Sequence, residues 1–388
     1  MVQVSSKNKK TDRTSPTSLF RPARVIALVV VAVFLYPLFI SILNSSSSSS
    51  SSTAGTIEWR HARDQEDGEE GLLEEEEKAQ LQLQPASNNR QNTATSQYYD
   101  DSKIVPLAPT LDTAPQTIVT AYFAVKSKYP AENYMKWMKN ILSVQDPMVI
   151  FLSPSLIPDI QALRQHALNR TVIIPMEVED VPLSKDTHIY NTSFWQHQLD
   201  IDPEAKRHRS YHVFWIWLSK SWWVTEAIRH NFFQSEVFLW SDMGCFRNEK
   251  YNGLTVVQHP DQVPRHSMLF LAHHPFNPPP QRIWNNKYTR DGKPHFYHSG
   301  SMMAGYYDVW PEYHAHFLQM IREFIQRDMF IGEDQTVAQS TCFTHPNLCA
   351  YINMEQLHRK DNHYFGLRYI LHHGGQYDLW YHPPLDAT

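Results

Sequence analysis

The sequence predicts an α/β fold with a mostly parallel sheet for the C-terminal part of this 388-residue chain. Apolar runs typical of buried strands begin at about residue 117, and segments of helical length separate them. Neighbouring parallel strands need crossover connections of that length. No internal repeat indicates a solenoid or a propeller. We therefore expect one large domain over residues 117–388, in which helices flank the sheet.

The predicted strands and helices alternate along this domain. A strand over residues 117–125 begins it, and a strand over 236–242 follows a long aromatic helix at 212–231. The segment 297–310 contains glycines and is assigned neither state. The remaining strands are predicted at 148–153, 171–177, 267–274, 348–353 and 368–373, and the remaining helices at 131–144, 157–168 and 311–328.

Residues 25–43 are apolar and uncharged, and as a helix they would match the thickness of a bilayer's hydrocarbon core. Basic side chains outnumber the single acid Asp12 in residues 1–24. The positive-inside rule then predicts a cytoplasmic tail, a signal anchor and type II topology. A cleaved signal peptide is the alternative, but the apolar run is longer than an ordinary signal sequence requires.

Residues 44–116 combine a serine run at 45–52 with acidic and Gln/Asn-rich stretches. Such a composition buries too little apolar surface to offset the entropy of ordering. We expect a disordered stem suited to O-glycosylation. Much of the net charge of −5 arises in this stem, and no basic patch predicts a nucleic-acid partner.

Three cysteines and two sequons suit a domain in an oxidising lumen. Cys342 and Cys349 lie seven residues apart, a spacing that permits a disulfide, while Cys245 would stay free or buried. The sequons at Asn169 and Asn191 are candidate N-glycosylation sites. None of the cysteines has zinc-finger spacing.

Asp242 ends an apolar strand in the segment "FLWSDMGCFRN" (238–248). Ligands of open α/β sheets bind outside the carboxyl ends of the strands. A carboxylate there can hold a divalent cation that also binds a diphosphate. The alternative is that Asp242 caps the turn that follows it.

Three further features have both a functional and a structural interpretation. The segment "HSGSMMAG" (298–305) would wall a sugar site or form a tight turn. Glu333 and Asp334 would supply a general base for an acceptor hydroxyl or cap a helix. Lys220 would reach a phosphate or extend its ammonium to the surface. Among the histidines, His372 or His373 could ligate a metal beside Asp242.

Taken in order, "TIVTAYF", "YMKWMKNIL", "FWIWLSKSWWVTEAI", "FLWSDMGCFRN", "HSGSMMAGYYDVW" and "GEDQTV" resemble the HtrL/YibB family, a group similar to GT-A glycosyltransferases. The resemblance covers residues 117–373 and implies a Rossmann-like nucleotide-sugar fold. It implies donor binding by Asp242, Lys220, Gly300 and Gly305, and it places the two glycines in the acceptor-side glycine segment. It makes Asp334 and Glu333 the catalytic or acceptor-binding acids.

One position departs from the GT-A pattern. The common metal motif is Asp-x-Asp, and Gly244 occupies its last position. A Mn²⁺ or Mg²⁺ ion would then depend on Asp242, a histidine such as His373, and the diphosphate.

These features together predict a type II membrane protein of the Golgi or ER. Its lumenal domain would transfer a sugar from a nucleotide-sugar donor to a glycan or glycoconjugate. The alternative is a non-catalytic carbohydrate-binding or scaffold protein on the same fold, which the incomplete metal motif favours. A metal hydrolase that uses the histidine pairs is disfavoured, because zinc-ligand spacing is absent.

Overall fold

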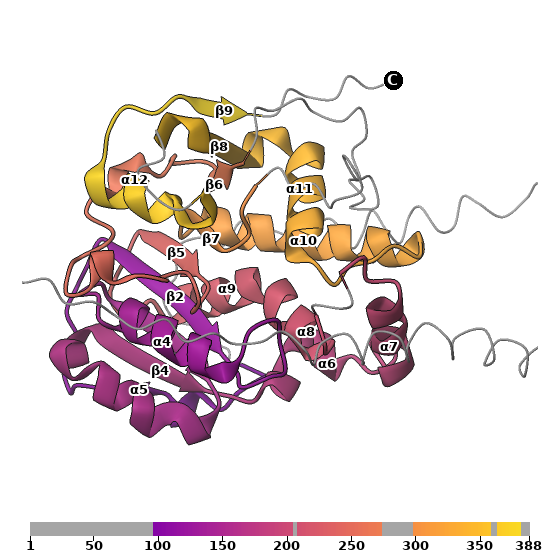
Figure 1. Ribbon diagram of the computed structural model, residues 1–388, viewed down its shortest axis with the longest axis horizontal. Coiled ribbons are helices and arrows are strands. Elements are labelled where there is room, and N and C mark those ends of the chain that lie inside the picture. Colours follow the sequence, from indigo (N-terminus) through magenta and orange to yellow (C-terminus); the bar gives the residue numbers. More distant parts are fainter. Residues whose placement is uncertain (1–95, 205–207, 274–297, 358–362, 382–388) are drawn as a thin grey trace, which may run out of the picture. The chain divides into compact units, whose positions relative to one another are not determined.

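The computed structural model describes residues 96–204, 208–273, 298–357 and 363–381 (Figure 1). All of them belong to one unit, Asn88–Thr388. The predicted cytoplasmic tail, membrane span and most of the stem lie outside the described residues. Within those residues, no helix is long and apolar enough to cross a membrane.

The described part of the chain forms a nine-stranded sheet with the order β1-β4-β3-β2-β5-β7-β6-β8-β9. Six of its strands, β2 to β6 and β8, coincide with strands expected from the sequence. The strands are β1 (Val105–Pro106), β2 (Gln116–Tyr122), β3 (Met148–Leu152), β4 (Thr171–Pro175), β5 (Val237–Ser241), β6 (Met268–Ala272), β7 (Met302–Tyr306), β8 (Cys349–Asn353) and β9 (Leu379–Tyr381).

The sheet is mixed, which corrects the expectation of a mostly parallel one. Strands β2 to β5 run parallel, as do β6 and β8, whereas β7 runs antiparallel to both of its neighbours. Strands β1 and β9 add antiparallel edges. Strand β7 comes from the glycine-containing segment to which the sequence assigned no element. Gly305 lowers the strand preference of this segment, because glycine weakens a strand interior. Pairing with β5 holds the segment in an extended conformation that its local sequence does not favour.

Helices pack on the sheet. Two expected elements differ from the structure, and the helices at 182–185, 192–200 and 334–344 were not expected from the sequence. The helix expected at 212–231 is broken at Ser219, whose φ of −92° and ψ of 0° lie outside the helical region. The strand expected at 368–373 is a helix, since a short apolar run does not distinguish the two states. The helices are α4 (Ala131–Leu142), α5 (Ile157–Leu163), α6 (Pro182–Lys185), α7 (Thr192–Asp200), α8 (His212–Leu218), α9 (Lys220–His230), α10 (Val309–Gln326), α11 (Asp334–Thr344) and α12 (Leu367–His373).

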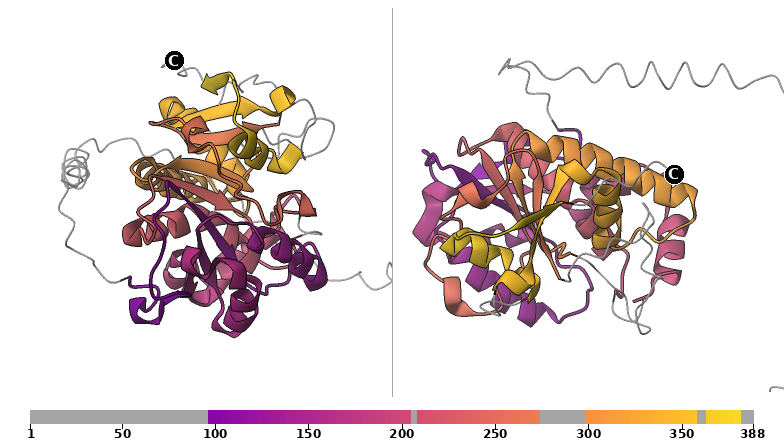
Figure 2. Two further views of the ribbon diagram at one scale, coloured as in Figure 1. Left: turned by 90° about the vertical axis from the view of Figure 1, so that its left-hand side faces the viewer. Right: turned by 90° about the horizontal axis from the view of Figure 1, so that it is seen from above.

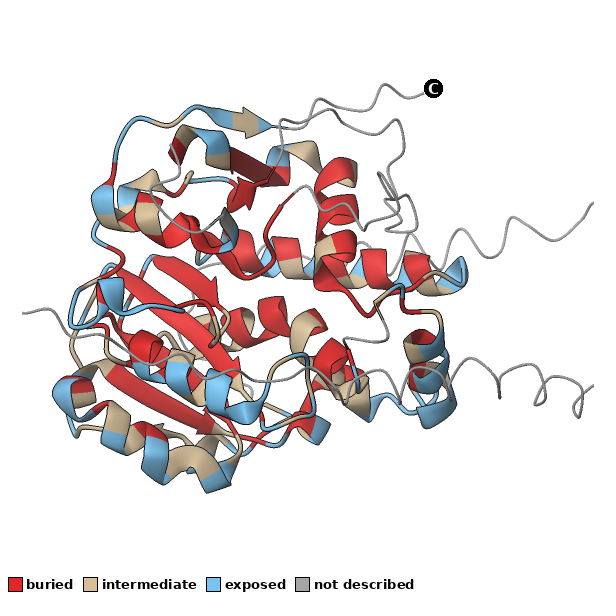
Figure 3. Cartoon of the chain, viewed as in Figure 1, coloured by how far each residue is buried: buried red, intermediate tan, exposed pale blue. Residues whose placement is uncertain are grey.

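Both faces of the sheet are covered, so the central strands are buried throughout (Figures 2 and 3). Phe238 and Trp240 of β5 belong to one apolar cluster, and Val237 and Leu239 belong to another. The first cluster includes α9 and α10, and the second includes α4 and α12. Alternating side chains of a strand point to opposite faces, which explains why one continuous apolar run serves two cores.

The folded unit begins before residue 117, which corrects the predicted boundary of the stem. Strand β1 pairs with β4, and the Tyr99 ring is buried in the core. The Tyr99 hydroxyl donates to Glu226 Oε2 at 2.9 Å, and Arg229 Nη2 donates to the same hydroxyl at 2.9 Å. The Tyr99 ring contacts Phe151 of β3 and Trp222 of α9, and such contacts between distant segments are not visible in the local sequence of residues 96–116.

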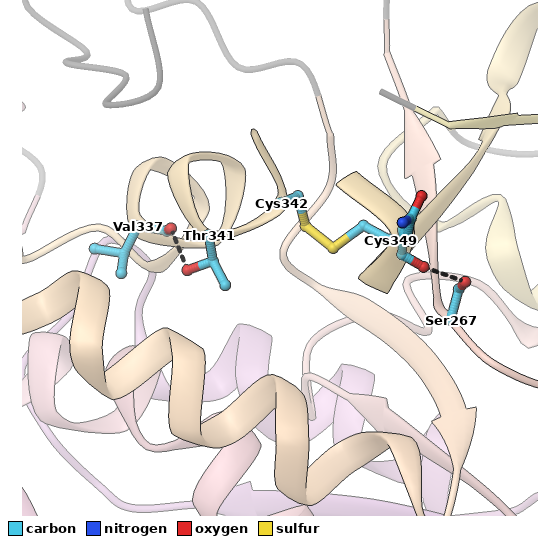
Figure 4. Close-up of a disulfide and its surroundings, with 6 residues drawn as sticks. Ser267, Val337, Thr341, Cys342 and Cys349 are labelled. Carbon is cyan, nitrogen blue, oxygen red and sulfur yellow. Dashed lines mark hydrogen bonds between the residues drawn. A yellow bond between two sulfur atoms is a disulfide. The ribbon is translucent and has the colours of Figure 1, made fainter. Parts of the chain in front are cut away.

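Cys342 of α11 and Cys349 of β8 form a disulfide (Figure 4). The bond closes the short connection between the two elements. Cys245 is a free thiol, and its burial raises its pKa to about 12. A thiol held protonated by burial is unreactive.

Candidate functional site

A cavity of about 750 Å³ opens beside the carboxyl ends of β2 and β5. Its walls include residues 121–131, which run from the end of β2 into α4, and residues 242–244, which follow β5. The strand order reverses here, because the chain places β3 and β4 on one side of β2 and β5 on the other. In open α/β sheets this switch point is where ligands bind.

Aromatic rings form one wall of the cavity. Tyr129, Tyr134 and Trp137 all line it, and the centres of the Tyr129 and Trp137 rings lie 5.1 Å apart, edge to face. The Arg247 guanidinium lies 4.5 Å from the centre of the Trp137 ring and 5.0 Å from that of Phe365. These contacts hold Arg247 at the cavity while its charge stays exposed.

The charge of the cavity is mainly positive. Among the described residues that line it, Lys126, Lys128, Arg209 and Arg247 are basic, and Asp242 is acidic. All four basic side chains are exposed. Guanidinium and ammonium groups donate several hydrogen bonds each, and together they attract phosphate oxygens.

Asp242 follows β5 directly and projects into this cavity with 33% of its side chain exposed. Its Oδ1 accepts from the Trp240 indole at 2.8 Å and lies 3.1 Å from Lys220 Nζ. The turn after it is closed by the backbone, since Cys245 N donates to the Asp242 carbonyl at 3.0 Å. The carboxylate therefore lines the cavity and pairs with Lys220, and the turn after Asp242 does not need it as a cap.

Lys220, the first residue of α9, is buried beneath Asp242. Its Nζ lies 2.7 Å from Asp334 Oδ2 and donates to the Gly300 carbonyl at 2.9 Å. Burial alone would lower the pKa of Lys220, but the two carboxylates outweigh it and raise the pKa above its ordinary value. Lys220 thus stays an ammonium, in contact with both Asp242 and Asp334.

The two acids predicted to be catalytic lie at the start of α11 and are buried. Neither Asp334 nor Glu333 is among the residues that line the cavity. Burial raises the pKa of the Asp334 carboxyl, and the Lys220 ammonium opposes this rise. Glu333 occupies the N-cap position of α11, but its side chain makes no capping hydrogen bond. Of the two acids, Asp334 acts on the cavity through Lys220.

The two predicted glycines support packing and do not line the cavity. A Cβ atom on Gly300 would come within 2.7 Å of Asp334 Oδ2, so the absent side chain lets the backbone approach α11. A Cβ atom on Gly305 would come within 2.7 Å of the sulfur of Met268. The glycine segment therefore positions Lys220 and β7, and its role as the wall of a sugar site stays a prediction.

The residues for a divalent cation do not converge. His373 is exposed at the end of α12, where its ring packs 4.3 Å from that of Tyr369, and it does not line the cavity. Within the described ranges, no group of three or more His, Cys, Asp or Glu side chains is placed to hold a metal. Gly244 leaves Asp242 without a second acid in its turn. The donor set does not fit the cation that the GT-A pattern implies.

His208 lines the cavity and was missed by sequence reasoning. Its Nδ1 lies 2.7 Å from Asp202 Oδ2, and both side chains are almost fully buried. Its ring packs edge-on against Trp217 at 4.9 Å. The basic and aromatic side chains of residues 126–137 were missed as well. They could have been identified from the sequence, because they directly follow β2 and Asp242 directly follows β5, so both lie at the same edge of the sheet.

Both sequon asparagines are exposed but make different contacts. Asn169 Nδ2, the atom that would carry a glycan, donates to Asp112 Oδ1 at 2.7 Å. Asn191 caps α7 through Oδ1, which accepts from the Phe194 amide at 2.9 Å. A glycan on Asn191 would leave its capping oxygen in place, whereas a glycan on Asn169 would crowd Asp112.

A family model described as "Bacterial protein of unknown function (HtrL_YibB)" matches residues 114–359. The chain belongs to the HtrL/YibB family. The matched region contains Asp242, Lys220, Asp334 and nearly all of the cavity, so the site is part of the HtrL/YibB domain. No curated protein matches the chain. Among solved structures, apo mouse xyloside xylosyltransferase 1 is similar with a TM-score of 0.36 and 10% identity, over 62% of this chain and 85% of that one.

Proposed function

We propose that this protein is a glycosyltransferase that takes its sugar from a nucleotide-sugar donor. The observation that carries the proposal is the cavity at the β2/β5 switch point, with basic side chains, aromatic walls and the Asp242 carboxylate. A nucleotide sugar has a matching part for each of them. Its diphosphate is anionic, its base and sugar offer flat or apolar faces, and its hydroxyls donate to a carboxylate.

In this proposal the basic side chains bind the diphosphate and stabilise the charge that develops as it leaves. Such fixed charges act most strongly where water is partly excluded. Arg247 is the best placed of them, because the rings of Tyr129, Trp137 and Phe365 restrict its position. Asp242 accepts hydrogen bonds from donor hydroxyls through the part of its carboxylate that stays exposed.

The acceptor hydroxyl must lose a proton as its oxygen attacks the anomeric carbon and the bond to the diphosphate breaks. We propose His208 for this role, since it lines the cavity and Asp202 holds its Nδ1. The proton would go to Nε2, which lies 3.5 Å from Glu204 Oε2. Asp334 is bonded to Lys220, so we propose that it positions Lys220 and does not act as a base. A catalytic role for Glu333 stays a prediction.

We also propose type II topology, with residues 25–43 in the bilayer and the folded unit in the lumen of the Golgi or ER. The disulfide supports an oxidising compartment, and the exposed sequons are accessible to the glycosylation machinery. A protease-protection assay on microsomes tests this arrangement. We expect the folded unit to be protected and to lose mass on N-glycan removal, and full digestion without detergent would contradict it.

The function is tested by binding and turnover with the full-length protein in detergent. We expect one of UDP, GDP and CMP to raise the melting temperature, and the matching nucleotide sugar to be consumed when a glycan acceptor is present. Arg247→Ala should weaken nucleotide binding by about tenfold, equivalent to about 1.4 kcal/mol. The matched control is Lys139→Ala, an exposed basic residue of α4 that lies outside the cavity.

Asp242→Asn separates catalysis from binding. It keeps the shape of the side chain but removes the charge, and we expect turnover to fall by about 10²-fold or more. Because Lys220 would lose one of its two carboxylates, a modest loss of stability should accompany it. If no nucleotide shifts the melting temperature but glycans do, the protein is the non-catalytic carbohydrate-binding alternative.

A further inference from the structure

Three oxygen atoms from three separate segments surround the Lys220 ammonium. They are Asp242 Oδ1 at 3.1 Å, Asp334 Oδ2 at 2.7 Å and the Gly300 carbonyl at 2.9 Å. We call this arrangement the oxygen cage. Carboxylate and carbonyl oxygens are also the ligands that Mg²⁺, Mn²⁺ and Ca²⁺ prefer. The cage therefore has the chemistry of a hard-cation site, and a lysine side chain fills it.

The cage includes Asp242, the residue to which the GT-A pattern would assign the cation. Asp242 is shared, since its carboxylate belongs to both the cage and the cavity. Its Oδ1 is already bonded to Lys220 and to the Trp240 indole. With Gly244 in place of a second acid and His373 away from the cavity, a divalent ion would meet a single exposed carboxylate. One carboxylate without phosphate oxygens makes only a weak site for such an ion, which takes most of its ligands from other oxygens.

We propose that the Lys220 ammonium permanently takes the place of the divalent cation, so that nucleotide diphosphate binds this cavity without a metal. The inference rests on the proposed function and deepens it. Two carboxylates and one ammonium leave the cage with a charge of −1, and Lys220 keeps Asp242 oriented toward the donor. The phosphate charge is met by the basic side chains of the cavity, and Lys220 is a positioning residue that does not touch the ligand.

The closeness of Gly300 to α11 supports this arrangement. Any side chain at position 300 would collide with Asp334, the carboxylate nearest the ammonium. The backbone can therefore contribute its carbonyl to the cage only with glycine at this position. The cage thus requires Asp242 after β5, Gly300 before β7 and Asp334 at the start of α11, in addition to Lys220 itself.

The first test uses the wild-type full-length protein and calorimetric titration. Mn²⁺ alone should not bind, and the affinity for the nucleotide diphosphate should agree within about twofold between EDTA and excess Mn²⁺. Stoichiometric Mn²⁺ binding, or a loss of affinity of about tenfold or more in EDTA, would overturn the proposal.

The second test empties the cage. Lys220→Ala leaves its three oxygen ligands around a space that a cation can enter, so Mn²⁺ should raise the melting temperature of this variant and leave the wild type unchanged. Lys220→Met is the control, because its side chain fills the space without a charge and should not respond. A lysine that only filled space would give no such rescue, and equal responses of Lys220→Ala and wild type would show the assignment to be wrong.

The two proposals fail in different ways. If no nucleotide binds, the glycosyltransferase proposal fails, while the Mn²⁺ titrations of wild type and Lys220→Ala still decide the role of Lys220. If Lys220→Ala does not fold, the wild-type titrations decide the question by themselves.

Discussion

His298 offers the most direct test of the energetics of this fold. Its ring is fully buried between Phe270 and Tyr351, with ring centres 4.6 and 5.8 Å away. Neither ring nitrogen has a hydrogen-bond partner among the residues that the structure describes. Burial, with a smaller contribution from His273, lowers its pKa from the ordinary 6.5 to about 3. The folded protein therefore holds this ring in its neutral form.

The depressed pKa makes stability depend on pH in a defined direction. As pH falls below 6.5, the unfolded chain protonates His298 while the folded protein does not, until pH approaches about 3. The free energy of unfolding therefore decreases across this window. At about pH 5 the loss from this one residue is about 2 kcal/mol, from about 1.4 kcal/mol per pH unit over about 1.5 units.

His298→Phe removes the titrating group and the two unsatisfied nitrogens. When the pH is lowered from about 7.5 to about 5, the free energy of unfolding of wild type should fall by about 2 kcal/mol more than that of the variant. This holds whatever the stability of the variant at the higher pH. Urea unfolding followed by tryptophan fluorescence measures this at both values. His188→Phe, at an exposed position, is the control and should show no such gain. If the free energies of unfolding of His298→Phe and wild type differ by the same amount at both pH values, the reasoning is refuted.

Three further predictions concern packing, the disulfide and the cavity. Gly300→Ala should cost about 1–3 kcal/mol in urea unfolding because its Cβ atom has no room, whereas Gly244→Ala makes ordinary contacts and should be tolerated; equal costs would contradict this. Replacing Cys342 and Cys349 by serine should lower the free energy of unfolding by about 2 kcal/mol, and native mass spectrometry that counts three free thiols in wild type would exclude the bond. Arg247→Ala should lower the melting temperature only slightly, because cation–π contacts of an exposed guanidinium are worth about 0.5–1 kcal/mol, and a large drop would make it a structural residue.

The sequence predicted most of the sheet but not its edges or its mixed character. The buried strands β2, β3 and β5 were predicted because a continuous apolar run records burial on both faces. Strand β7 and the short strand β1 were not predicted. Their residues adopt an extended conformation by pairing with β5 and β4, and pairing partners are not visible in a local window.

The candidate site shows the same division. Asp242 was identified because a carboxylate at the end of an apolar strand is conspicuous in the sequence, and it does line the cavity. Lys220 was identified with an open role, since its position in an aromatic helix allowed either a phosphate contact or an ammonium extended to the surface. Its partnership with Asp334 was not predicted, because it arises where α9 and α11 meet.

By itself, the sequence determined the α/β class, the positions of the main strands along the chain, the HtrL/YibB resemblance and the position of one carboxylate. These depend on apolar spacing and on residue identity, which are local properties. Only the tertiary structure decided that β7 runs antiparallel and that Gly300 and Gly305 serve packing. It also decided that an ammonium lies between two carboxylates, because distances between side chains far apart in the chain depend on strand order and helix packing.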